Sequence, residues 1–394
     1  MHLPFSPADW LVIAAYLLVL VAGGWIFTPR KTASAHEYFL AGGNVPAWLA
    51  AVSVLSATQS AATFLGGPDY GYGADLTYLT GTVGGLLGAM FVAHVMIPRF
   101  YAIRATTAYE LLTMRFGIRA TRWAGGMFLI GRVFAGGARV YLAAIALAMV
   151  ITGTVDATGI LVAAALLVIA SVLFTFIGGL KSVLWNDLIQ FVVYLGSAIA
   201  VLVFLRLSIP ASNGAIVDAL RSAPGGIDKL RLFDFSLDLS RPFSLLAILT
   251  GITLLYIANA GMDQDTTQRL LACKDARTGA RGLYLSVFAT IPTVGLFIVI
   301  GLLLHIFYNR PDLMAGAAGT AGQAFGIFMH YILTELPGGL RGLVTIGICA
   351  AAVATTNSAL NAMSSVLVQD FYRPWRERRG AVAEAHFVTA GRAG

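Results

Sequence analysis

Two groups of uncharged polar side chains interrupt long apolar stretches of the sequence. The first, in VLSATQSAATF, comprises Ser56, Thr58, Gln59, Ser60 and Thr63. The second, in AVATTNSALNA, comprises Thr355, Thr356, Asn357, Ser358 and Asn361. Such oxygens suit a weakly bound alkali cation, because they can replace its hydration shell. The alternative is that the hydroxyls bond back to carbonyls of the preceding turn and that small residues let helices pack closely.

Charged residues inside apolar stretches are the other candidates for chemistry. Arg132 and Arg139 are seven residues apart and share one helix face. Each pairs with a neighbouring helix, or Arg139 holds a carboxylate of a solute through a bidentate contact. Asp187, with Gln190 three residues on, is either an interfacial carboxylate near a helix N-terminus, a second cation ligand, or part of the exit towards the cytoplasm.

The composition restricts the class of protein. Of the 394 residues, 11% are charged and 58% are hydrophobic, whereas soluble proteins carry about 25% charged residues. Too few polar groups are available to cover a water-exposed surface, which excludes a soluble enzyme, a disordered protein and a secreted disulfide scaffold. Cys273, Cys349 and six scattered histidines show no metal-binding spacing. No Ser/His/Asp arrangement is present either, so we expect no enzymatic activity.

These polar groups must be positioned by helices that cross a membrane. Because a bilayer core needs about 20 apolar residues per helix, nine spans are predicted: 10–27, 46–66, 76–98, 123–152, 159–177, 183–206, 243–263, 283–308 and 340–368. Gly66–Gly67–Pro68 is expected to end the second span. At about 1.5 Å per residue, both polar groups fall near mid-membrane. The second span is therefore expected either to unwind there, freeing carbonyls, or to use its polar groups for packing.

The positive charges indicate the orientation. Most of the 26 lysines and arginines, Arg269 among them, lie in one set of alternate loops, which the positive-inside rule makes cytoplasmic. The N-terminus is then outside and the C-terminal tail inside, and the net charge of +7 reflects topology rather than nucleic-acid binding. Residues 207–242 form an outer loop, and a surface helix is expected at Gly322–Leu336. Residues 370–394 form a basic cytoplasmic linker.

Three segments resemble the sodium/solute symporter family, which covers sodium-coupled carriers of sugars, proline, pantothenate, iodide and sialic acid. They are GGLKSVLWNDLIQ (178–190), GMDQDTTQRLLACKD (261–275) and AAVATTNSALNAMSSVLVQDFY (351–372), supported by SATQSAATFLG (56–66). The resemblance implies one transmembrane domain with the leucine-transporter fold, an all-α bundle of two inverted repeats. The first repeat would be 46–206. The second, 243–369, would be incomplete and lack two helices, so we expect a truncated chain or part of a longer one.

The resemblance also implies binding residues. Sodium ligands would be the carbonyls of Ser56, Gln59 and Ala351 and the hydroxyl of Thr355, whereas Ala354 stands where the family commonly has a second hydroxyl. Thr356 or water would replace that hydroxyl, or the site has fewer ligands. Asp187 and Ser358 match positions that some members use for a further sodium. Substrate contacts would fall on Thr58, Ser60, Thr63, Arg139, Asn259 and Asp263.

The expected function is sodium-coupled symport of a small, carboxylated solute into the cell by alternating access. The partners would be sodium, the solute and the lipid bilayer of a bacterial inner membrane, without nucleic acid or an obligatory protein partner. A non-transporting sensor on the same fold, a passive channel and an inactive truncated transporter are the alternatives.

Overall fold

The computed structural model describes residues 5–27, 34–152, 155–224, 226–314 and 326–393. The expected all-helical architecture is confirmed for these residues, whose only strand-like pairings are isolated bridges. The helices are α1 (Pro7–Phe27), α2 (Ala35–Leu40), α3 (Ala47–Thr58), α4 (Ala61–Gly73), α5 (Gly81–Phe91), α6 (Ile97–Ala102), α7 (Glu110–Phe116), α8 (Ile118–Thr152), α9 (Ala157–Ser208), α10 (Asn213–Arg221), α11 (Leu245–Ala247), α12 (Thr253–Gly261), α13 (Gln264–Leu271), α14 (Ala276–Asn309), α15 (Ile327–Thr334), α16 (Leu340–Val366), α17 (Arg373–Glu377) and α18 (Glu384–Ala393).

Several of these helices are long and apolar enough to cross a membrane. Within the described residues they are Leu76–Ala102, Ile118–Met149, Gly179–Ser208, Ala276–Asn309 and Leu340–Glu377. Two bent pairs, α3 with α4 and α11–α12 with α13, pass the same test as pairs, and shorter apolar helices cover Pro7–Gly23 and Ala157–Val172. The predicted count of nine crossings stays a prediction, because length and composition alone do not place a membrane.

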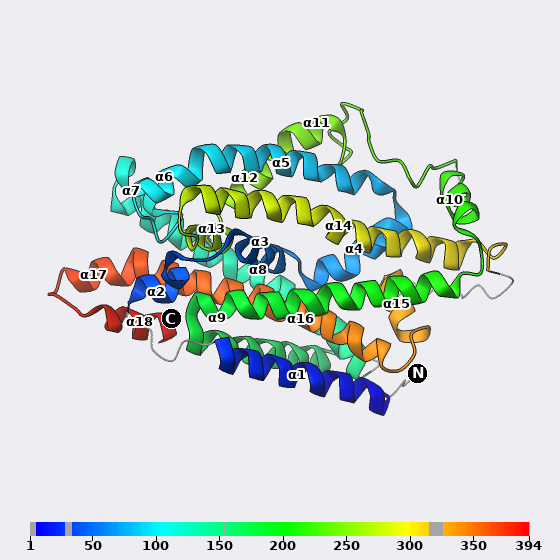
Figure 1. Ribbon diagram of the computed structural model, residues 1–394, viewed down its shortest axis with the longest axis horizontal. Coiled ribbons are helices and arrows are strands. Elements are labelled where there is room, and N and C mark those ends of the chain that lie inside the picture. The colour runs from blue at the N-terminus through cyan, green and yellow to red at the C-terminus, as the bar shows by residue number, and fades with distance from the viewer. Residues whose placement is uncertain (1–4, 28–33, 153–154, 225, 315–325, 394) are drawn as a thin grey trace.

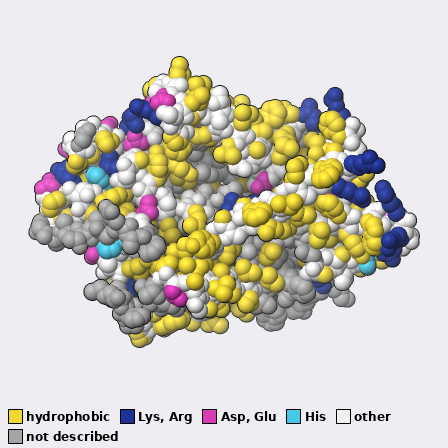
Figure 2. Space-filling view, turned by 180° about the vertical axis from the view of Figure 1, so that it is seen from behind, with side chains coloured by type: hydrophobic (Ala, Val, Ile, Leu, Met, Phe, Trp, Pro, Cys, Tyr) yellow, Lys and Arg dark blue, Asp and Glu magenta, His cyan; other side chains and the backbone are white. Residues whose placement is uncertain are grey.

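The long helices lie along the longest axis of the molecule (Figure 1). α2, α7, α17 and α18 are at one end, and α10 and α15 are at the other. Lysines and arginines gather on the visible face at the end that carries α7 and α17, as Figure 2 shows. This gathering is what the positive-inside rule requires of a cytoplasmic end, although the side of the membrane itself stays a prediction.

The expected end of the second span at Gly66–Gly67–Pro68 is wrong. α4 contains Pro68, which lacks the amide for one helical hydrogen bond, and nevertheless continues to Gly73 in close contact with α14. At the contact, a Cβ on Gly71 would lie 2.3 Å from the Ile298 carbonyl oxygen, and one on Gly301 would lie 2.1 Å from the Pro68 carbonyl oxygen.

This contact gives a stability prediction. Gly301→Ala is expected to lower the free energy of unfolding by about 1–3 kcal/mol, because the new methyl overlaps backbone atoms that cannot rotate away. The matched control is Gly295→Ala on the same helix, where the nearest atom to a new Cβ is 3.9 Å away. The control should be neutral or stabilising, because alanine favours helix over glycine. Thermal unfolding in detergent measures both, and equal effects would contradict the packing argument.

Two of the predicted spans, 159–177 and 183–206, correspond to two helical segments within α9, which are separated by a break at Gly179. Gly179 has φ 58° and ψ −161° inside α9. A side chain there would be strained, and its Cβ would lie 2.6 Å from the Tyr38 carbonyl oxygen. The glycine therefore allows both the bend and the close approach of α2.

The helix expected at Gly322–Leu336 is shorter and is buried rather than on the surface. Residues 315–325 lie outside the described part of the chain, and α15 begins at Ile327. The side chain of Phe328 is 0% exposed, and its amide donates to Asp69 Oδ1 at 3.0 Å. Phe328 also stacks on Phe64 of α4, with ring centroids 6.0 Å apart. Burial of this apolar face overrides the surface position that the short length indicated.

The predicted linker at the C-terminal end is folded. α16 continues through a π-helical turn, Leu367–Tyr372, into α17, and α18 then packs back on the bundle. Phe387 of α18 is buried beside Phe39 of α2, and the Gly391 carbonyl accepts from Ser364 Oγ at 2.6 Å. The apolar positions of α18, masked in sequence by its small and charged residues, account for the error.

The predicted outer loop is tied to the end of α4. Lys229 Nζ donates to the carbonyls of Tyr72 and Ala74, both at 2.8 Å, and so caps the C-terminus of this helix. Burial lowers the pKa of the Lys229 ammonium. Arg231 adds a contact of 2.7 Å between its guanidinium and Asp75.

Candidate functional site

The first element of the candidate site is a helix broken in its middle. α3 ends at Thr58, α4 begins at Ala61, and the two segments meet at an angle of 73°. Both intervening residues, Gln59 and Ser60, have extended backbone conformations. The break lies in the centre of the first polar group, which confirms the predicted unwinding.

The break leaves oxygen atoms without donors. Among the described residues, no backbone amide donates to the Ser56 carbonyl, because the helix does not continue to supply one. Gln59 is 7% exposed, and its Oε1 is buried without a hydrogen-bond partner. Thr58 follows the packing alternative instead, since its hydroxyl donates back to the Val54 carbonyl at 2.9 Å.

The second element is another broken helix, which runs in the opposite direction. The segments Leu245–Gly261 and Gln264–Leu271 bend by 58°. The Val45 amide, just before α3, donates to the Ala272 carbonyl, just after α13, at 3.0 Å. The first broken helix therefore begins at the end of the molecule where the second one finishes, as inverted repeats require.

A buried arginine on α13 connects four helices. Arg269, 1% exposed, forms ion pairs with Asp187 of α9 at 3.1 Å and with Asp265 at 2.9 Å. Its Nε donates to Ser53 Oγ of α3 at 2.7 Å, and its Nη2 donates to Ser358 Oγ of α16. Counting Arg269 among the loop cations is therefore wrong, because the polar sequence of α13 is folded into the bundle.

This arginine also changes the interpretation of Asp187. The side chain is 0% exposed, so this carboxylate does not face solvent. Its Oδ2 accepts from Arg269 and from Ser53 Oγ, while Oδ1 is buried without a partner. The two residues matched to a further sodium, Asp187 and Ser358, thus both contact Arg269.

The serines that bind Arg269 fix the register of α3 against α16. Ser56 follows Ser53 by three residues, and Thr355 precedes Ser358 by three. The chain direction of α3 is opposite to that of α16 (Figure 1). Moving about 4.5 Å from the shared arginine along each helix therefore brings Ser56 and Thr355 to the same level.

On α16 the candidate ligands are buried. Thr355 is 2% exposed, and its hydroxyl donates to the carbonyls of Ala351 and Ala352, both at 3.0 Å. Ala354 is 0% exposed and supplies no side-chain oxygen. The Thr356 hydroxyl, the proposed replacement for the missing second hydroxyl, donates to the Ala352 carbonyl at 2.8 Å.

The two arginines of α8 have different environments. Arg132 is 8% exposed and pairs with Asp263 at 3.3 Å and with Asp265. The alternative in which this arginine is neutralised by a neighbouring helix is therefore confirmed for Arg132. Since Asp265 also binds Arg269, an alternating chain of charges runs from α8 through α13 to Asp187.

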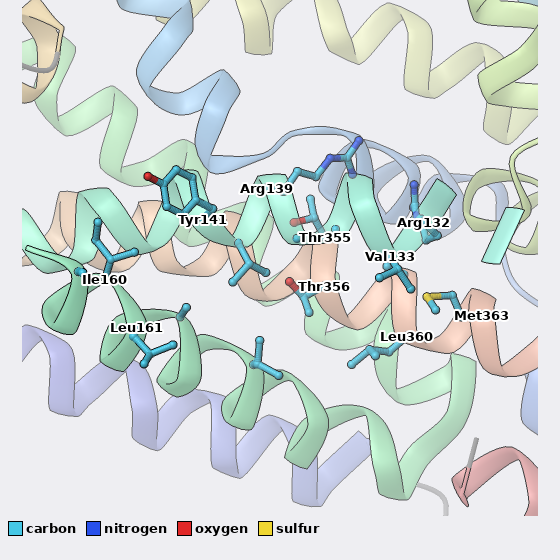
Figure 3. A pocket seen from close by; sticks show the side chains of 17 residues that line it. Arg132, Val133, Arg139, Tyr141, Ile160, Leu161, Thr355, Thr356, Leu360 and Met363 are labelled. Carbon is cyan, nitrogen blue, oxygen red and sulfur yellow. The ribbon is translucent and has the colours of Figure 1, made fainter. Parts of the chain in front are cut away.

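Arg139 faces a cavity instead. It is half-buried, and no carboxylate among the described residues pairs with it. The cavity, about 590 Å³, lies between α8, α9 and α16 and is also lined by Tyr141, Thr355 and Thr356. Figure 3 shows Arg139 and Arg132 projecting from α8 towards the same side, with Thr355 beside Arg139. A guanidinium beside hydroxyls in a mainly apolar cavity can bind an anionic group.

The other predicted substrate residues do not line this cavity. Thr58 and Asn259 are exposed, Ser60 is buried at the start of α4, and Thr63 is half-buried on α4. Asp263 Oδ1 accepts from the Asp265 amide at 2.9 Å and so caps α13, while Oδ2 binds Arg132. The structure brings Arg139 and Thr355 together, but it does not gather all six predicted contacts in one cavity.

Sequence reasoning missed the polar contacts of α13. Gln264 accepts from the Ala108 amide at 2.8 Å and donates to Ser365 Oγ at 3.0 Å. Gln268 donates to Asn361 Oδ1 at 3.0 Å. A signal was present, because Asp265 and Arg269 are spaced for an i,i+4 pair within a motif already singled out.

Comparison with known proteins gives a consistent result. The model of the sodium:solute symporter family matches residues 38–392. The sodium/sialic acid symporter SiaT of Proteus mirabilis is 28% identical over 98% of this chain and 77% of that protein. The human sodium-coupled monocarboxylate transporter 2 is 27% identical over 94% of this chain and 58% of that protein.

Solved structures agree in fold. The substrate-bound, outward-open state of a Na⁺-coupled sialic acid symporter superimposes with a TM-score of 0.85 at 26% identity, covering 99% of this chain and 79% of that one. The nucleobase-cation-symport transporter Mhp1 matches with a TM-score of 0.52 at 15% identity, over 92% of this chain and 73% of that one, and shows the fold alone. With a family match over most of its length, the chain belongs to the sodium:solute symporter family.

Proposed function

We propose that this protein carries a small carboxylated solute into the cell together with sodium. Family membership makes it a membrane-embedded, sodium-coupled carrier of a small solute. The observation that carries the finer proposal is the half-buried Arg139, which faces the cavity beside Thr355 without a carboxylate partner among the described residues. Sialic acid and monocarboxylates, the solutes in the names of two relatives, both supply a carboxylate for it.

In this proposal sodium bridges the break of α3–α4 to α16. The carbonyls of Ser56, Gln59 and Ala351 and the hydroxyl of Thr355 supply the ligands, and the register through Arg269 supports this pairing. Gln59 Oε1, buried and without a partner, offers the oxygen that Ala354 does not. These uncharged oxygens suit sodium better than a divalent cation, which favours carboxylates.

The proposed inward direction of transport follows from sodium moving down its gradient. Residues 46–206 form the first repeat and 243–369 form part of the second, with the N-terminus outside and the tail in the cytoplasm. Sodium then enters from the outer end and stabilises the state in which α3 and α16 are bridged. Coupling is reciprocal, because each ligand raises the affinity for the other by the same factor.

The sodium site is tested by Thr355→Val. The variant removes one oxygen ligand and keeps the volume, so the sodium concentration for half-maximal uptake is expected to rise about tenfold or more. Thr345→Val is the matched control, because this buried threonine of the same helix donates to the Arg341 carbonyl at 2.8 Å and is not among the proposed ligands. An unchanged sodium dependence in Thr355→Val would rule out this ligand.

Transport itself is tested with the purified chain in proteoliposomes. Uptake of labelled sialic acid and of a labelled monocarboxylate is compared under an inward sodium gradient and under an equal potassium gradient. We expect uptake that depends on sodium, together with counterflow of labelled solute at equal sodium on both sides. Sodium leak without counterflow would identify a channel, and solute binding without uptake would identify a sensor or an inactive fragment.

A further inference from the structure

A second cavity lies at the opposite end of α16 from the outer loops, away from the candidate transport site. It has a volume of about 700 Å³ and is formed where α8 begins and where α16 passes into α17 and α18. Its wall includes Arg122, Leu367, Phe371, Trp375 and Arg378. None of these residues takes part in the proposed transport, so the cavity needs another explanation.

The two arginines of this cavity, Arg122 and Arg378, are available to bind an anion. The Nε of Arg122 is buried without a hydrogen-bond partner, and neither Arg122 nor Arg378 pairs with a carboxylate of the described residues. Arg373 on α17 is different, since Glu377 at 2.8 Å and Glu384 at 2.6 Å neutralise it. Glu377 and Glu384 are therefore already paired, and an anion from outside the chain would neutralise Arg122 and Arg378.

The rest of the wall is apolar and aromatic. Leu367 is 41% exposed and Trp375 is 45% exposed, and the Arg379 guanidinium lies 4.0 Å from the centre of the Trp375 ring. Trp123, next to Arg122, is 76% exposed. Tryptophan and arginine together at the end of membrane-spanning helices are typical of the headgroup level of a bilayer.

We propose that this cavity binds the headgroup of an anionic phospholipid. The guanidinium groups of Arg122 and Arg378 bind the phosphate, and the apolar wall at Leu367 and Phe371 contacts the start of the acyl chains. A soluble anion would use the arginines but would leave the exposed leucine and tryptophan without apolar contact. In the orientation proposed above, this lipid belongs to the cytoplasmic leaflet, and its binding does not depend on the identity of the solute.

The test compares lipid binding to the purified full chain and two double variants. Arg122→Gln/Arg378→Gln removes the proposed contacts. Arg277→Gln/Arg281→Gln is the matched control, with the same loss of charge from exposed positions on α14 at the same end. Native mass spectrometry with phosphatidylglycerol should show about a tenfold loss of affinity in the first variant alone. Phosphatidylcholine should bind all three proteins equally and more weakly.

Two further measurements keep the proposal falsifiable if the first variant folds poorly. A photoreactive phosphatidylglycerol is crosslinked to the unmodified chain, and the label is expected within residues 367–378 or at Arg122. Glycerol 3-phosphate is then added as a soluble competitor, which should not displace the lipid at equal concentration. Labelling elsewhere, equal loss of lipid binding in the control variant, or displacement by glycerol 3-phosphate would each overturn the proposal.

Discussion

Arg269→Gln is expected to lower the free energy of unfolding by about 3–5 kcal/mol, the cost typical of breaking a buried ion pair from one side. The arginine is 1% exposed, and its removal leaves Asp187 buried without a cation. Glutamine cannot replace the contacts to Ser53 and Ser358 simultaneously, so α3, α9 and α16 also lose their common partner. Thermal or denaturant unfolding of the purified protein in detergent measures the change.

The partner carboxylate should be less sensitive than the arginine. In Asp187→Asn, Arg269 keeps its ion pair with Asp265 at 2.9 Å and its bond to the Asp265 carbonyl at 2.6 Å. The amide oxygen of the asparagine can still accept from Ser53. Asp187→Asn should therefore lower the free energy of unfolding less than Arg269→Gln does. The loss in the double variant should be smaller than the sum of the two single losses.

Matched surface changes provide the control for this cycle. Arg277→Gln removes the same charge from an exposed position at the start of α14 and should change stability by about 0.5 kcal/mol or less. If Arg269→Gln is equally mild, the ion pairs of α13 do not hold these helices together. The same result would also remove the support for the Ser56–Thr355 register.

The sequence allowed the broken helix and its polar residues to be predicted because the signal there is local. Ser56, Gln59 and Ser60 lie within five residues of each other in an apolar stretch. The interruption of the helix can therefore be predicted from these neighbouring residues, without knowledge of distant segments. The same holds for the long apolar helices, whose lengths follow from the thickness of a bilayer.

The environment of Arg269 could not be predicted from local pattern. Its partners on α3, α9 and α16 are separated from it by between 82 and 216 residues. The segment Gln264–Leu271, close to Lys274, also has the polar composition of a loop. The burial of α15 was missed for a related reason. Its contacts with Asp69 and Phe64 lie on α4, so only tertiary packing distinguishes it from a surface helix.

Arg139→Gln is expected to reduce uptake of a carboxylated solute by about 30- to 150-fold, because a charge-assisted contact of about 2–3 kcal/mol is lost. The change should appear mainly as a higher solute concentration for half-maximal uptake. The sodium dependence should remain, since Arg139 is not among the proposed sodium ligands. The measurement is sodium-driven uptake in proteoliposomes with labelled sialic acid or a labelled monocarboxylate.

A neutral solute provides the sharpest control for this contact. The methyl ester of the transported acid cannot form an ion pair. It should therefore bind the unmodified protein about as weakly as the acid binds Arg139→Gln. The ester should also bind the unmodified protein and Arg139→Gln with equal affinity. Arg132→Gln, by contrast, leaves Asp263 and Asp265 without their shared cation, and its first effect should be on stability rather than on solute affinity. Equal sensitivity of acid and ester to Arg139→Gln would show that this arginine shapes the cavity but does not bind the carboxylate.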